Sequence, residues 1–135
     1  MARKRQRVEL EYLLRVFPHR DNRKAGHNVV ISIETLKEFV SFQYEVLLEE
    51  RRTDNEFSFR ILGLHAPRSV MPAVGPARGI RVLGALRGTY RIRVSKPDGP
   101  ENLFSFKISD TTIRLLESPE QPFVLFSTEP IPITI

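Results

Sequence analysis

Arginine is the residue of this chain best suited to binding chemistry, since it outnumbers lysine by 16 to 5. Arg91 and Arg93 stand two residues apart in a stretch of alternating apolar and polar residues, so on a β-strand they project from the same face. Guanidinium groups bind phosphate bidentately and are weakly hydrated. The spacing therefore predicts a polyanion-binding or nucleic-acid-binding face. Its members are Arg60, Arg81, Arg87, Arg91 and Arg93, extended by Arg3, Lys4 and Arg5 at the N-terminus.

Charge is segregated along the sequence, and this supports a second interpretation of the arginines. Residues 57–97 contain eight basic residues and no acidic one, whereas the segments on either side carry most of the acids. If strands from these segments pair, arginines gain carboxylate neighbours and the surface is neutralised. Single-stranded nucleic acids stack on exposed aromatic rings, but here Tyr90, Phe104 and Phe106 fall in the opposite register. Nucleic-acid binding is therefore the alternative hypothesis.

No constellation of residues in the sequence predicts catalysis or a cofactor. The chain has no cysteine, which excludes disulfides, thiolate metal sites and cysteine nucleophiles. Its three histidines, His19, His27 and His65, fall in or beside expected loops and lack the spacing that holds a metal. No serine lies in a Gly-x-Ser-x-Gly turn, and there is no glycine-rich phosphate loop. We expect a protein that is not an enzyme and holds no metal or cofactor.

Apolar residues in two proline-rich segments point to a partner. Residues 65–79 contain three prolines and two glycines, which predicts a loop with no central strand. The C-terminal tail alternates isoleucine with proline, which predicts an edge strand that completes its own sheet or an extended arm. The expected partner-binding residues are Val70, Met71, Val74, Ile131, Ile133 and Ile135. The leading hypothesis is a binding or assembly module that self-associates or holds a protein partner. A ligand pocket beneath the loop is a weaker possibility.

A β-hairpin over residues 88–108 must position much of this chemistry. Its two apolar runs alternate with polar residues, and a Lys-Pro-Asp-Gly-Pro-Glu-Asn cluster separates them, where neither strand can continue. The expected core side chains are Tyr90, Ile92, Val94, Phe104, Phe106 and Ile108. Arg91 and Arg93 then face solvent.

Residues 34–52 have two interpretations. Thr35-x-x-Glu38 is a capping-box pattern that would begin a short helix within 35–50. Alternating apolar residues from Val40 to Leu48, followed by a turn and a second alternating run, favour a long hairpin instead. Further strands are expected at 7–17, 28–33, 80–86 with a bulge at Gly84, 113–116 and 123–126.

About eight or nine short strands predict an all-β protein, either an antiparallel β-sandwich of immunoglobulin-like architecture or a small barrel. Residues 1–6 are expected to form a flexible basic arm, 7–129 a single domain and 130–135 the tail. No apolar run approaches the roughly 20 residues that span a bilayer. Glu9 and Glu11 occupy the place of a signal peptide's apolar region, so a cytoplasmic protein without membrane contact is expected.

Overall fold

The computed structural model describes residues 9–20, 27–40, 44–66, 74–110 and 112–133, and within these the protein is all-β, as expected. The strands are β1 (Tyr12–Arg20), β2 (His27–Phe39), β3 (Glu45–Arg52), β4 (Glu56–His65), β5 (Gly75–Gly84), β6 (Gly88–Ser95), β7 (Glu101–Ser109), β8 (Thr112–Glu117) and β9 (Val124–Ser127). In this part of the chain no helix is long and apolar enough to cross a membrane.

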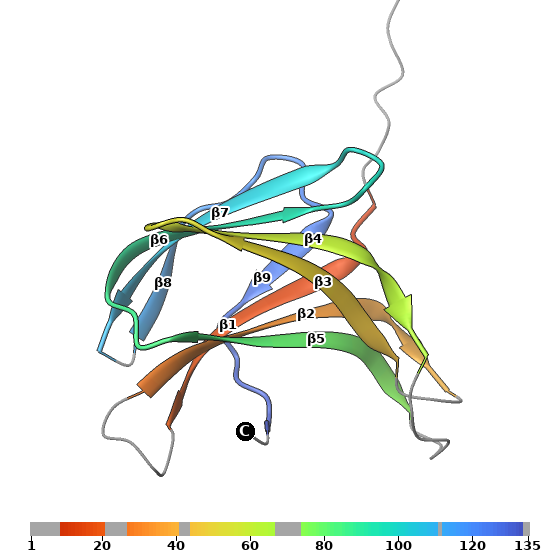
Figure 1. Ribbon diagram of the computed structural model, residues 1–135, viewed down its shortest axis with the longest axis horizontal. Coiled ribbons are helices and arrows are strands. Elements are labelled where there is room, and N and C mark those ends of the chain that lie inside the picture. The colour runs from red at the N-terminus through yellow and green to blue at the C-terminus, as the bar shows by residue number, and fades with distance from the viewer. Residues whose placement is uncertain (1–8, 21–26, 41–43, 67–73, 111, 134–135) are drawn as a thin grey trace, which may run out of the picture.

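The strands hydrogen-bond into one sheet in the order β8-β7-β6-β4-β3-β5-β2-β1-β9. The sheet curls so that β7, β6, β4 and β3 form an upper layer over a lower layer of β5, β2 and β1 (Figure 1). Most neighbours are antiparallel, but β1–β9, β3–β5 and β4–β6 are parallel. An immunoglobulin domain has two separate sheets. The immunoglobulin-like detail of the prediction is therefore not confirmed.

The alternating residues of each strand place one face of the sheet in the core between the layers. The β6–β7 hairpin has the expected register and turn, and Gly99 supplies a φ of 118° there. Five of its six expected core residues are buried, namely Ile92, Val94, Phe104, Phe106 and Ile108. Tyr90 is only half-buried, and its ring centroid lies 5.9 Å from that of Phe57 and 6.5 Å from that of Phe106.

The segment 35–50 is extended in its described residues, so the helix considered for it is not observed there. β2 continues through Thr35, and β3 and β4 form the expected hairpin. The Thr35 hydroxyl accepts a hydrogen bond from the Ala77 N–H (2.9 Å) and donates one to the Lys37 carbonyl (2.8 Å). This hydroxyl therefore links strands instead of capping a helix.

The prediction that residues 65–79 contain no strand is wrong at both ends, because β4 extends into this segment and β5 begins within it. Gly79 shows the physical reason why this segment forms part of β5 despite its glycines and proline. A Cβ at this position would lie 2.6 Å from the Val46 carbonyl oxygen, so only glycine permits β5 to pass so close to β3. A bulge is expected at Gly84, and the structure has it one residue earlier. Leu83 is the extra residue of β5, where the register between β2 and β5 shifts.

Polar side chains of the β6–β7 hairpin tie the upper layer to the residues where β1 and β9 begin, at the other end of the sheet. Asn102 is buried, and its Oδ1 accepts hydrogen bonds from the N–H groups of Phe123 (2.9 Å) and Val124 (3.2 Å). Lys96 Nζ donates to Glu11 Oε1 at 2.7 Å. This hydrogen bond raises the pKa of Lys96 above its usual value. The two distant ends of the sheet are thus held together.

Candidate functional site

The outer face of the upper layer carries charged and hydroxyl side chains in cross-strand rows. β4 lies between β3 and β6, and residues that alternate with the core side chains point outward on all three strands. One row is Glu49, Arg60 and Ser95, and the next is Arg51, Ser58 and Arg93. The pairing of strands therefore gathers residues that are far apart in the sequence on one surface.

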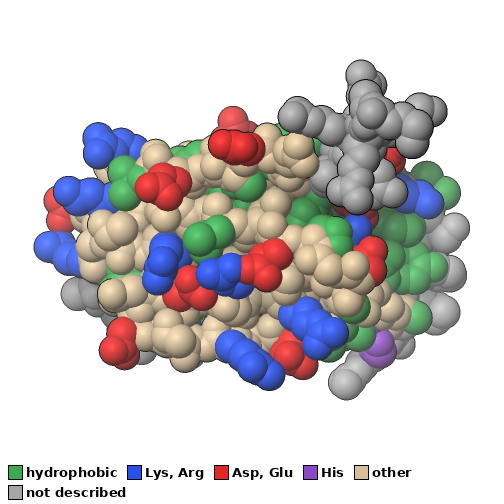
Figure 2. Space-filling model, turned by 90° about the horizontal axis from the view of Figure 1, so that it is seen from above, with side chains coloured by type: hydrophobic (Ala, Val, Ile, Leu, Met, Phe, Trp, Pro, Cys, Tyr) green, Lys and Arg blue, Asp and Glu red, His purple; other side chains and the backbone are tan. Residues whose placement is uncertain are grey.

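Arg91 and Arg93 lie on this outer face, as expected, but acidic side chains flank them. Glu56 of β4 lies 3.5 Å from Arg91 Nε and 3.2 Å from Arg93 Nε, and Arg93 also pairs with Glu101 of β7. Figure 2 shows this face, with basic and acidic groups interleaved and no continuous basic band. These acidic partners come from the sequence segments on either side of the acid-free stretch, as expected for a surface on which the arginines are neutralised.

Two of the other three arginines of the expected band are not gathered with them. Arg87 lies in the connection from β5 to β6, and its Nη2 is 2.6 Å from Asp110 Oδ1. Arg81 belongs to β5 in the lower layer, and its Nη1 donates to the carbonyl of Ile80 (2.9 Å). Of the three, only Arg60 shares the outer face of the upper layer. The residues expected to extend the band, Arg3, Lys4 and Arg5, lie outside the described residues.

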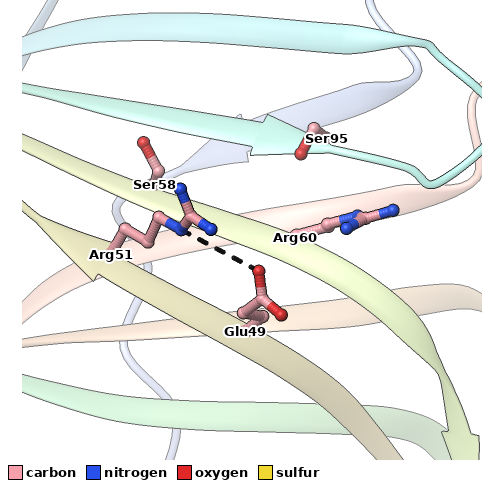
Figure 3. A pocket seen from close by; sticks show the side chains of 5 residues that line it. All are labelled: Glu49, Arg51, Ser58, Arg60 and Ser95. Atoms are coloured by element: carbon pink, nitrogen blue, oxygen red, sulfur yellow. Dashed lines mark ion pairs between the residues drawn. The ribbon is translucent and has the colours of Figure 1, made fainter.

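A shallow pocket of about 260 Å³ opens on this face between β3, β4 and β6 (Figure 3). The two serines that line it are much shorter than their charged neighbours, and this difference in length forms the hollow. The guanidinium of Arg51 is turned toward the carboxylate of Glu49 (Figure 3). The lining residues are Glu49, Arg51, Ser58, Arg60 and Ser95.

The lining of the pocket holds two guanidinium groups and one carboxylate. Arg51 Nε lies 4.0 Å from Glu49 Oε1, and the Arg51 side chain is 83% exposed, so this pair is loose. Arg60 forms no ion pair with any other described residue. The pocket therefore offers N–H donors that the sheet leaves free. Of these lining residues the arginine pattern in the sequence indicates Arg60 alone, although the alternation of Glu49 and Arg51 on one strand also points to Arg51.

Large apolar side chains are exposed where β2 and β4 end and β3 and β5 begin. Val74, an expected partner-binding residue, is 72% exposed, and Val40 beside it is 77% exposed. We call this surface the apolar end. It consists of Val40, Leu47, Leu62, Leu64 and Val74. Three further residues expected to bind a partner, Val70, Met71 and Ile135, lie outside the described residues.

The C-terminal tail forms no strand over residues 128–133. It runs beneath the lower layer (Figure 1), where Arg15 Nη1 of β1 donates to the Glu129 carbonyl at 3.2 Å. Ile131 and Ile133 are half-buried. Of the two predicted forms of the tail, the structure has the extended arm in these residues, and the arm lies against its own domain.

A buried ion-pair network that sequence analysis missed lies on the outer face of the lower layer. The side chain of Glu34 on β2 is 4% exposed, and its two oxygens lie 2.9 Å from Arg15 Nε and 2.6 Å from Arg78 Nε. These partners are 19 and 44 residues away in sequence, so no local pattern indicates them. The network joins β1, β2 and β5. Since both carboxylate oxygens are occupied, we assign it to holding these strands together and not to binding.

The part of the chain that the structure describes contains no group of three His, Asp or Glu side chains that could hold a metal ion. His19 and His27 lie in β1 and β2, and His65 ends β4. The ligand pocket considered beneath residues 65–79 falls on a segment whose central residues, 67–73, are outside the described part. No family model, no curated protein and no solved structure matches this chain.

Proposed function

We propose that this protein is a non-enzymatic β-sheet module that self-associates through the apolar end. The observation that carries the proposal is the exposure of five large apolar side chains from neighbouring strand ends. Burying such a patch is favourable in proportion to its area, and contiguous apolar surface on a domain marks contact sites. The proposal keeps Val74 of the expected partner-binding residues and adds side chains from β3 and β4.

The surroundings of the apolar end favour a second copy of the chain as its partner. Lys37, Glu38 and Glu45 are exposed near it and give the rim both signs of charge. In a two-fold dimer the same patch faces itself, so a mixed rim can place a base of one copy against an acid of the other.

Replacing Leu64 by lysine tests the proposal. The wild-type protein should run above its 15.6 kDa monomer mass in size-exclusion chromatography with light scattering at micromolar concentration, and Leu64→Lys should shift it to the monomer. The matched control is Val82→Lys on β5, because Val82 is 43% exposed and Leu64 is 42% exposed. A monomeric wild type, or equal dissociation by both variants, would contradict the proposal.

Polyanion binding through the arginine face is the second candidate. Arg60 and the pocket favour it, but Arg87, Arg91 and Arg93 already have acidic partners. Neutralised arginines release few counterions on binding, and this release supplies most of the affinity for phosphate backbones. An oligonucleotide titration at about 50 mM salt checks this candidate, and we expect weak binding or none.

A further inference from the structure

We propose that the pocket between β3, β4 and β6 binds a phosphate monoester, with Arg51 and Arg60 as its main contacts. A monoester carries close to two negative charges at neutral pH and three terminal oxygens. The pocket offers two guanidinium groups and two hydroxyls as donors. This site does not depend on self-association, since none of its lining residues belongs to the apolar end.

The register of the sheet holds the donors at fixed separations. Arg51 is the direct partner of Ser58 across β3 and β4, and Arg60 is that of Ser95 across β4 and β6. Adjacent strands lie about 4.8 Å apart, and outward residues on one strand about 7 Å apart. Ser58 and Ser95 are half-buried and form the floor. Arg51 lies near Ser58, whereas the exposed Arg60 side chain extends away from Arg51 (Figure 3). Binding a phosphate over the serines therefore requires the flexible Arg60 side chain to turn toward it.

The state of the charged groups leaves the pocket open to an anion. The loose Arg51–Glu49 pair contributes little free energy because it is exposed, so a ligand can replace Glu49 as the partner of Arg51. Arg93, in the same row as Arg51 and Ser58, is already held by Glu56 and Glu101. Arg52 and Arg91 also have acidic partners, so among the arginines of β3, β4 and β6 the free donors are those of the pocket.

The size of the pocket selects a small anion. Its volume of about 260 Å³ lies just below the range that holds drug-sized ligands, so it accommodates a phosphate and the first atoms attached to it. A carboxylate, with two oxygens and one charge, would use only part of the donor set. The phosphate can belong to a small metabolite or to a phosphoserine side chain, and both present the same group to the pocket.

Calorimetric titration of the intact protein at low salt tests the site, with phenyl phosphate as the probe and benzoate as the carboxylate comparison. We expect phenyl phosphate to bind saturably and benzoate to bind more weakly. Arg60→Gln should raise the Kd for phenyl phosphate about tenfold, since a charge-assisted hydrogen bond is lost. Glu49→Gln should lower the Kd, because it removes the negative charge that competes with the ligand.

Arg87→Gln is the matched control, because Arg87 is exposed and paired with Asp110, neither of which lines the pocket. It should leave the Kd for phenyl phosphate unchanged.

A phosphoserine peptide, compared with phenyl phosphate, distinguishes the two sources of the phosphate group. Equal affinity assigns the site to small ligands, and much tighter peptide binding assigns it to a phosphorylated polypeptide. Absence of saturable binding, an unchanged Kd in Arg60→Gln, or equal losses in Arg60→Gln and Arg87→Gln would overturn the proposal.

Discussion

Glu34 is the charged residue on which the strand pairing of the lower layer most depends. Its carboxylate is bonded on both sides, to Arg15 of β1 and to Arg78 of β5, and is almost fully buried. Removing Glu34 leaves the part-buried guanidinium groups of Arg15 and Arg78 without their carboxylate, which costs more than the lost contacts alone. A carboxylate on an exposed face differs, because water replaces its partner.

Replacing Glu34 by alanine should therefore lower the free energy of unfolding by about 2–3 kcal/mol, because water can hydrate the part-exposed arginines in part. Urea denaturation followed by circular dichroism measures this value. Glu49→Ala is the matched control, since it removes a carboxylate from an exposed pair and should cost at most about 1 kcal/mol. Similar losses in the two variants would show that burial does not govern the effect.

At the residue scale, the sequence predicts which side chains of a strand are buried, but it does not predict contacts between strands that are far apart in the sequence. Phe106 is buried as expected because its register within one strand decides which face it occupies. The ion pair of Glu34 cannot be predicted in this way, because its partner Arg78 lies on β5, and the sequence alone does not show that β5 pairs with β2. The pocket shows the same limit. The sequence indicates Arg60 as an outward arginine, but it does not show that strand pairing brings Ser58 and Ser95 beside it.

At the element scale, the β6–β7 hairpin was predicted because its turn and both its strands are contiguous in sequence. The sequence places the start of β5 at residue 80, later than Gly75, where the strand begins, because proline and glycine indicate a loop. Gly79 instead serves a close approach to β3, and no local rule separates these two uses of glycine. The predicted boundary of β5 is therefore wrong where contact with a second strand, β3, decides whether the backbone is extended.

The tail provides a prediction at this scale. Ending the chain after Thr128 removes Ile131 and Ile133, which are half-buried against the domain, and the Glu129 carbonyl that Arg15 binds. We expect the melting temperature to fall while the oligomeric mass stays that of the full chain, because the tail is not part of the apolar end. Calorimetry and light scattering measure the two quantities. An unchanged melting temperature would contradict the packed arm, and dissociation would move the interface to the tail.

At the scale of the whole molecule, the sequence predicts an all-β class but not the curled sheet. Parallel neighbours such as β4 and β6 come from segments separated by another strand, and choosing them requires the complete topology. The junction that holds the sheet's distant ends together is equally non-local. Lys96 and Glu11 are 85 residues apart, and Asn102 reaches Phe123 across 21 residues.

This junction should make the fold sensitive to alkaline pH. The hydrogen bond to Glu11 raises the pKa of Lys96 above 10.5, and burial raises the pKa of Tyr12 above 10.0. A raised pKa means that the folded protein keeps the proton to higher pH than the unfolded chain. Both contributions are therefore complete below pH about 10 and are lost as pH rises through the folded values. The melting temperature should fall over this range, as measured by circular dichroism.

Two variants separate the titrating part of the junction from the rest. Lys96→Met should flatten the alkaline fall, because Tyr12 is then the one residue of the junction whose pKa is raised. Asn102→Ala removes a non-titrating acceptor of two backbone N–H groups and should lower the melting temperature equally at neutral and alkaline pH. If the wild type and Lys96→Met lose stability with the same slope above pH 10, the Lys96–Glu11 hydrogen bond does not close the sheet, and Asn102 alone holds the two layers at this junction.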